Sequence, residues 1–198
     1  MITRLLISLL LSAVLLCGCM DMQYERYKAV MKRELASGAH ADSLFFGIHF
    51  GMTSKQFFAH CWEMNKRGLF TDGKGNTAVL YKLNNHELKH PASLNFYPTF
   101  THNRISRLWA TFEYDGWAPW NKHLWSDSLM ADVLALYKKW YNTGNPFLTI
   151  TDKKRGTIYV KVDGNRRIII GRYNDIQVKV DYTDMLTAQQ GNKDVTKR

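Results

Sequence analysis

The chain has 198 residues, and its 27 lysine and arginine residues outnumber its 17 aspartate and glutamate residues, for a formal net charge of +10. Apolar residues make up 45% and charged residues 22%, values typical of a folded protein and unlike those of a disordered chain. Four prolines and 13 glycines exclude a collagen-like chain, and three cysteines are too few for a disulfide scaffold. The length allows one domain, or two small ones, with a real core.

The first residues have the pattern of a secretory signal. Arg4 supplies one positive charge, and residues 5–16 are then almost continuously apolar. That run is shorter than the roughly 20 apolar residues that a transmembrane helix needs. The pattern therefore predicts an export signal. An uncleaved anchor is the alternative.

The four residues Leu16-Cys17-Gly18-Cys19 resemble a bacterial lipobox, the site at which a lipoprotein precursor is cleaved. The resemblance implies cleavage after Gly18, lipidation of Cys19 and a mature chain that is anchored to a membrane in the bacterial envelope. Met20, which follows the lipidated cysteine, implies transfer to the outer membrane. The face of that membrane, periplasmic or external, is not specified by these residues.

The lipobox divides the chain into four predicted parts: a signal peptide (1–18), a lipid-anchored tether or linker helix (19–43), a globular domain (44–186) and a disordered tail (187–198). Residues 21–36 lack glycine and proline and are rich in helix formers. Tyr27, Met31 and Leu35 recur at intervals of four, which gives a narrow apolar stripe. We expect this helix either to rest near anionic lipid headgroups or to be a solvated stalk.

The globular domain alternates helices and strands twice. Thr53 and Gln56 fit a capping box that begins a helix, and Gly68 fits its end. Leu129, Val133 and Leu136 recur at helical spacing within a second predicted helix from 126 to about 142. Strands are predicted at 44–50, 78–83, 93–97, 105–114, 147–151, 157–162, 167–171 and 176–182. The order indicates an α+β fold: an antiparallel sheet of about seven to eight strands with two main helices on one face.

Residues 86–90, His-Glu-Leu-Lys-His, match the H-E-x-x-H pattern of zinc peptidases. That pattern works on a helix, where two histidines four residues apart share one face and bind the metal. Pro91 disfavours a helical conformation at His90, and the flanking segments are predicted strands. We therefore interpret His86 and His90 as part of a polar loop, with a zinc hydrolase as a remote alternative.

Three tryptophans, Trp117, Trp120 and Trp125, lie in the segment before the second helix. Aromatic side chains among polar neighbours can form a platform for a sugar ring or for an apolar patch of a partner. The interpretation that we favour is that these tryptophans cover the open end of the core.

Basic residues are concentrated in the last strands, and Lys161, Arg167 and Lys179 are the candidate binding cations. An exported lipoprotein rarely meets nucleic acid, so we expect no nucleic-acid partner, and an anionic lipid or an acidic glycan is more plausible. A solvated outer sheet face is the simpler interpretation.

Catalysis has little support in the sequence. There is no G-x-S-x-G motif, phosphate loop or dinucleotide-binding fingerprint. After cleavage and lipidation, Cys61 stands alone, and we expect a buried thiol that behaves as a small apolar group. We predict no enzyme activity and no cofactor.

Residues 47–53, Gly-Ile-His-Phe-Gly-Met-Thr, resemble the strand-to-helix start of small bacterial lipoproteins of the outer-membrane assembly type, of related inhibitor-like folds and of Bacteroidota lipoproteins. These folds pair helices with a small antiparallel sheet and are non-enzymatic binding modules. The resemblance implies a lipid-anchored interaction module with an envelope protein as partner. A module that binds envelope glycan or anionic lipid is the alternative.

Overall fold

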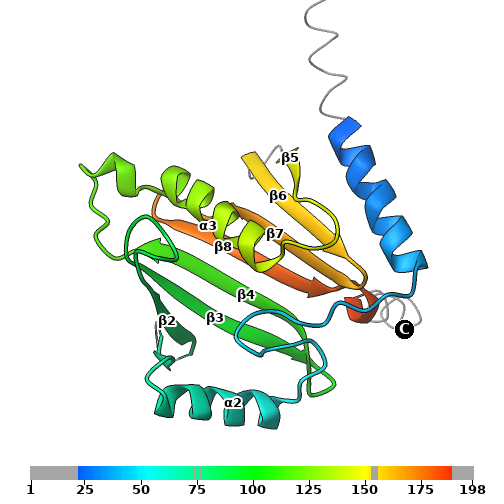
Figure 1. Cartoon of the computed structure of the whole chain (residues 1–198), viewed down its shortest axis with the longest axis horizontal. Coiled ribbons are helices and arrows are strands. Elements are labelled where there is room, and N and C mark those ends of the chain that lie inside the picture. Colours follow the sequence, from blue (N-terminus) through cyan, green and yellow to red (C-terminus); the bar gives the residue numbers. More distant parts are fainter. Residues whose placement is uncertain (1–21, 74, 76, 153–155, 189–198) are drawn as a thin grey trace, which may run out of the picture.

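A computed structural model describes residues 22–73, 75, 77–152 and 156–188 (Figure 1). The predicted signal peptide, Cys19 and residues 189–198 of the predicted tail lie outside the described residues. The described chain contains one eight-stranded sheet, in which all neighbours are antiparallel and the order is β1-β2-β3-β4-β8-β7-β6-β5. The predicted α+β class is therefore confirmed.

The sheet is two four-stranded meanders placed side by side. Within each half, every strand pairs with the next one in the chain, and β4 joins the halves by pairing with β8. One helix precedes each meander. The strands are β1 (Thr71–Asp72), β2 (Val79–Leu83), β3 (Ala92–Thr101), β4 (Arg104–Tyr114), β5 (Leu148–Asp152), β6 (Gly156–Asp163), β7 (Arg166–Arg172) and β8 (Gln177–Asp184). The helices are a described segment at 22–36, α2 (Ser54–Lys66), the 3-10 turn η2 (Lys122–Leu124), α3 (Ser126–Trp140) and a last turn at 185–188.

The main core lies between the sheet and α3. Leu129, Val133 and Tyr137 of α3 are fully buried against β4, β7 and β8. Complete burial of one such apolar side chain contributes roughly 1.5–3 kcal/mol. The helical spacing in the sequence therefore identifies the face of α3 that packs into the core. The helix begins without the predicted serine cap, because Ser126 is buried and Trp125 is the N-cap.

The helix α2 has the predicted boundaries. Thr53 and Gln56 form both hydrogen bonds of the capping box, and Gly68 adopts a positive φ just after the helix. Of its large apolar side chains, Phe57 is buried, whereas Phe58 and Trp62 are exposed. Helix α2 therefore contributes much less to the core than α3 does.

The N-terminal helix packs on the sheet rather than projecting from it. Tyr27 is buried in a second apolar cluster with β5 and β6, and Val30, Met31 and Leu35 pack against the same cluster. In β7, Ile168 and Ile170 belong to the main core, whereas Ile169 packs on this second cluster. Since successive side chains of a strand point to opposite faces, the N-terminal helix covers the face opposite α3. The helix is therefore part of the folded body and not the solvated stalk that was one of the two expectations.

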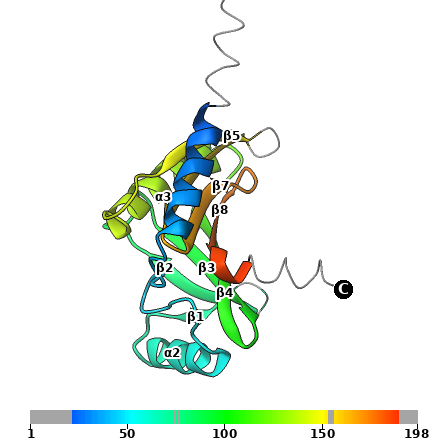
Figure 2. The same cartoon turned by 90° about the vertical axis from the view of Figure 1, so that its right-hand side faces the viewer.

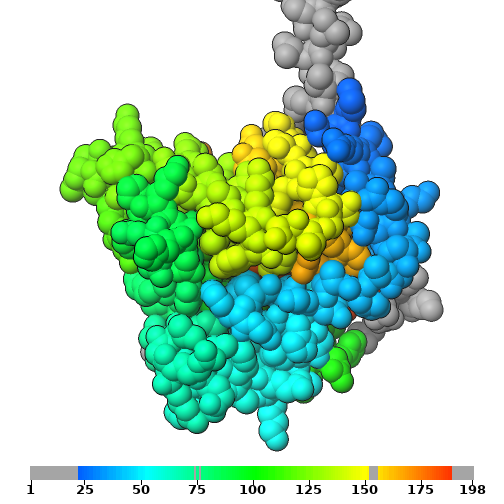
Figure 3. Space-filling model, viewed as in Figure 1, coloured from blue at the N-terminus to red at the C-terminus, as the bar shows by residue number. Residues whose placement is uncertain are grey.

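Residues 44–50 do not form the predicted strand. Phe46 and Gly47 have positive φ angles and form a turn, and only one isolated bridge, between Ser43 and His49, is present. The apolar side chains of the segment are buried in the main core. Figure 3 shows the segment running over the surface between α2 and α3. An apolar run predicts burial, but it does not distinguish a strand from a loop that covers the core.

Residues 187 and 188 of the predicted disordered tail are part of a helical turn. Residues 185–188 form a helical turn, in which the Thr187 hydroxyl donates to Asp184. Among the described residues, no helix has both the length and the apolar character needed to cross a membrane.

Candidate functional site

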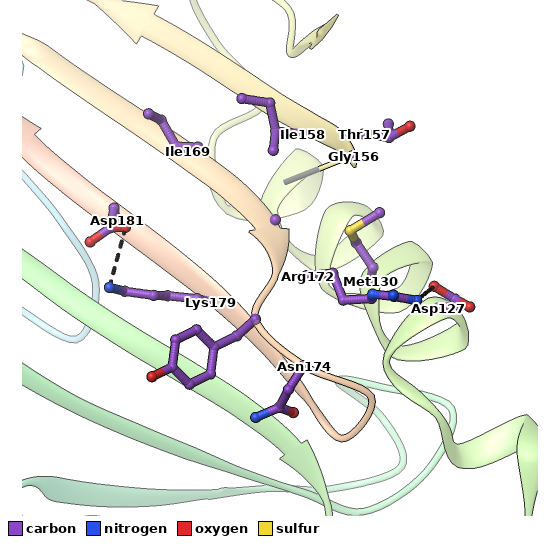
Figure 4. Close-up of a pocket in the computed structure, with 12 residues that line it drawn as sticks. Asp127, Met130, Gly156, Thr157, Ile158, Ile169, Arg172, Asn174, Lys179 and Asp181 are labelled. Carbon is purple, nitrogen blue, oxygen red and sulfur yellow. Dashed lines mark hydrogen bonds and ion pairs between the residues drawn. The ribbon is translucent and has the colours of Figure 1, made fainter. Parts of the chain in front are cut away.

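A cleft of about 750 Å³ opens where β6 begins and β7 ends (Figure 4). The first turn of α3 and the middle of β8 complete its lining. Ile158 and Ile169 lie beside each other on the apolar part of the lining, and Met130 contributes from α3. The opposite part of the lining carries charged side chains. The cleft therefore offers apolar and charged surface to one ligand.

The charged residues of the cleft are ion-paired. Arg172 lies 3.2 Å from Asp127 of α3 and 3.9 Å from Asp175, and Lys179 lies 3.6 Å from Asp181. All of these side chains are at least partly exposed. Exposed ion pairs contribute roughly 0–1 kcal/mol to stability. A ligand that supplies an opposite charge can therefore replace one member of such a pair at little cost in free energy.

A second, smaller hollow of about 190 Å³ adjoins the cleft on the same sheet. Lys179 and Asp181 line both spaces, and Arg107 and Trp109 of β4 line only the smaller one. Arg107 also lies 3.7 Å from Asp181. A short row of charged and aromatic side chains thus crosses the sheet from β7 to β4.

Of the three predicted binding cations, Lys179 alone lies in the cleft. Lys161 is only 2% exposed, and its Nζ donates to the carbonyl oxygens of Thr143 and Asn145 and pairs with Asp163 at 3.2 Å. The expectation of a solvated outer face is therefore wrong at Lys161. The reason lies in the alternation of β6: Val160 and Val162 face the N-terminal helix, so Lys161 points to the other face, where the loop after α3 supplies carbonyl groups.

Arg167 is half-buried and makes its hydrogen bonds within the fold. Its guanidinium donates to the Tyr27 hydroxyl at 3.3 Å and to the Thr183 hydroxyl at 3.4 Å. Arg167 therefore joins β7 and β8 to the N-terminal helix and is not part of the cleft lining. The three cations do not form one anion-binding surface.

The three tryptophans of the loop before α3 have different environments. Trp117 and Trp125 are half-buried, and their Nε1 atoms are buried without a hydrogen-bond partner among the described residues. Trp120 is 81% exposed. Trp120 is therefore the most accessible of the three tryptophans to a ligand or a surface.

The His-Glu-Leu-Lys-His segment is a turn between β2 and β3. Glu87 accepts hydrogen bonds from the Tyr81 hydroxyl at 3.1 Å and from the Asn84 N–H at 3.2 Å. Burial and the nearby Glu87 raise the pKa of Tyr81 to about 12. His86 is exposed, whereas the His90 ring packs 5.4 Å from that of Tyr114. The segment lacks the helix on which the zinc motif depends, and the described residues contain no cluster of three potential metal ligands.

Other polar groups inside the fold have structural roles. The Tyr141 hydroxyl donates to Leu44 O at 2.6 Å, and the Tyr182 hydroxyl bonds to Tyr137 at 2.8 Å and to Tyr141 at 3.0 Å. Cys61 is only half-buried, not fully buried as expected, and this partial burial raises the pKa of its thiol to about 11.

The concentration of basic residues in the last strands predicted Lys179 of the cleft lining. No local pattern singles out Asp127 of α3, because its ion pair with Arg172 joins residues that are far apart in the sequence. Comparison with protein-family models, curated proteins and solved structures gave no match.

Proposed function

We propose that this chain is a lipid-anchored protein of the bacterial envelope, in the outer membrane, that binds another envelope protein without catalysing a reaction. The cleft beside β6, β7 and β8 carries the proposal. The lipobox-like residues before Cys19 support the anchor. The mature chain keeps a positive net charge, because Arg4 is the only charged residue of the signal.

The shape and chemistry of the cleft favour a protein segment as ligand. The cleft and the adjoining hollow reach from β6 to β4, which is three strand spacings or about 14 Å. That length matches about four residues of extended chain. Ile158 and Ile169 offer apolar contact, and the exposed Lys179–Asp181 pair offers charges of both signs. A protein loop with one apolar and several charged side chains complements this surface.

The lining favours binding over catalysis. Among the described residues that line the cleft there is no histidine, cysteine or serine. Its acidic and basic side chains pair with each other. General acid–base catalysis requires a titratable group that is free to exchange a proton with the reacting atoms, and these carboxylates face cations in ion pairs.

An acidic glycan is the second candidate ligand. Tyr173 is exposed at the cleft, and Lys179 Nζ lies 5.9 Å from the centre of its ring. An aromatic ring beside a cation suits a sugar that carries a carboxylate or a phosphate.

Site-specific photocrosslinking in intact envelopes tests the proposal. A photoreactive amino acid at Tyr173 is expected to give one discrete protein adduct, and the same group at Phe58 on α2 is the control position. Lys179→Glu is expected to reduce the adduct by about fivefold to tenfold, because it places a like charge beside Asp181. Lys139→Glu, on the exposed side of α3, is the matched charge reversal and leaves the adduct unchanged.

Two results would contradict a protein partner. One is an adduct that forms equally at both crosslinking positions and does not respond to Lys179→Glu. The other is the absence of a protein adduct together with binding to acidic glycans that Lys179→Glu abolishes. The second result would identify an acidic glycan as the ligand of the cleft.

A further inference from the structure

The N-terminal helix is fixed to the body by contacts that extend beyond its apolar stripe. Gly164 N–H donates to Glu34 Oε2 at 3.0 Å, and the Ala41 N–H donates to Asn165 Oδ1 at 2.7 Å. Tyr27, nearer the start of the helix, is buried and bonded to Arg167. The helix is thus held along most of its length. The helix therefore has a fixed orientation relative to the sheet.

The position of the predicted lipid follows from this docking and from chain length. Cys19 precedes Met22, the first described residue, by three residues. Three residues span at most about 11 Å. If Cys19 is lipidated, as the proposed function states, the lipid enters the bilayer within that distance of the helix start. Figures 1 and 2 both place the helix start and α2 at opposite ends of the molecule.

Exposed apolar and basic side chains occur at this end. Met22 and Tyr24, in the first described turn, are 65% and 51% exposed, and Lys28 Nζ lies 5.1 Å from the Tyr24 ring. The loop that carries Trp120 and Lys122 is on the same half of the molecule in Figure 1, across the sheet from the helix. Tyrosine and tryptophan accumulate where bilayer meets water, and lysine is attracted to anionic headgroups.

We propose that the protein rests on the membrane by this end, in a fixed orientation with two contacts. The first contact is the start of the N-terminal helix, with Met22 and Tyr24 at headgroup level. The second is Trp120 on the loop before α3, whose exposed indole enters the interface. Helix α2, with its exposed Trp62, faces away from the membrane. The partner surface is a bilayer that contains anionic phospholipid. This inference rests on the lipid anchor of the proposed function.

Tryptophan fluorescence in vesicles tests the orientation. The full lipidated protein is reconstituted into vesicles of phosphatidylglycerol and phosphatidylcholine with brominated acyl chains, which quench only nearby indoles. Trp120→Phe is expected to lower the quenched signal about twofold, since Trp120 supplies the most exposed indole at the interface. Trp62→Phe, which removes another exposed indole at the far end, leaves the quenched signal unchanged.

The two possible failures are distinguishable. Mass spectrometry of the purified protein reports the lipid on Cys19, and Cys19→Ser provides the unlipidated form. An unmodified Cys19 would contradict the anchor and with it the orientation. A lipidated protein whose quenching responds to Trp62→Phe, or does not respond to Trp120→Phe, would overturn the orientation alone. Thermal unfolding of each variant shows that it remains folded.

Discussion

The two faces of the sheet use alternate residues of the same strands for different purposes. On one face, α3 and residues 44–52 close over fully buried side chains, and a chain of buried tyrosine hydroxyls satisfies its own hydrogen bonds. On the other face, the N-terminal helix packs against β5, β6 and Ile169 of β7. Beyond that helix, β8 and β4 present partly exposed ion pairs. The closed face holds the fold together, and the open face remains available for contacts.

This difference follows from burial. Removing apolar surface from water contributes about 25 cal/mol per Å², whereas exposed ion pairs contribute roughly 0–1 kcal/mol. A substitution on the closed face should therefore act on stability, and one on the open face should act on binding. Four measurements test that contrast.

Leu129→Ala on the closed face should have the largest effect. Leu129 is fully buried between α3 and the sheet, and its truncation leaves a cavity in the main core. We expect a loss of about 2–5 kcal/mol in the free energy of unfolding. Urea unfolding followed by circular dichroism measures it. Leu134→Ala, at a half-buried position of the same helix, is the matched control with a smaller loss.

Tyr27→Ala in the second cluster should lower the free energy of unfolding by less than Leu129→Ala does. Its effect should be confined to the N-terminal helix. The substitution removes one apolar contact under the N-terminal helix and the hydrogen bond from Arg167. We expect a loss of about 1–2 kcal/mol. Hydrogen exchange should become faster at residues 22–36 and stay unchanged in α3. A loss as large as that of Leu129→Ala, with faster exchange throughout, would show that the two faces are one cooperative core.

Acidification should weaken the contact between Glu34 of the N-terminal helix and the N–H of Gly164. The N–H of Gly164 is the main cause that lowers the pKa of Glu34 below its ordinary 4.5, and the Asn145 side chain adds to it. A carboxyl group whose pKa is lowered by folding stabilises the fold above its unfolded pKa. That contribution should be lost as the pH falls below 4.5 toward the lowered value. Glu34→Gln should remove this part of the pH dependence, as measured by thermal unfolding between pH 3 and pH 7. An identical profile in the variant would exclude Glu34 as its source.

Lys179→Ala on the open face should have the smallest effect on stability. Its partner Asp181 is also close to Arg107, so one charge contact remains. We expect a change within about 0.5 kcal/mol in the free energy of unfolding, because exposed ion pairs contribute little. Thermal unfolding measures it beside the crosslinking yield. A large loss of stability would show that Lys179 supports the fold rather than the cleft.

Local patterns predicted most of the secondary structure. The spacing of Leu129, Val133 and Leu136 identified α3 and its buried face, and the capping box at Thr53 identified the start of α2. The strands predicted at 157–162 and 167–171 correspond to the β6–β7 hairpin. These features depend on residues that are close in sequence, and that is why they could be predicted.

Features that depend on distant residues could not be predicted. Lys161 lies in an alternating strand like any solvated lysine, and only the loop at 143–145 makes it a buried, paired cation. The stripe of Tyr27 and Met31 predicts an apolar face, but nothing near it in sequence identifies the sheet as its partner. The cleft likewise needs Asp127 and Arg172, which are 45 residues apart.

The sequence by itself determined the class of fold, the positions of most helices and strands, and the signal on which the membrane anchor is proposed. Charge and periodicity are local properties, so they can be recognised from the sequence alone. The tertiary structure decided which face of each element is covered, because burial depends on segments brought together from across the chain. It closed one face of the sheet into a core, docked the N-terminal helix on the other, and left Lys179 and Asp181 beside an open cleft.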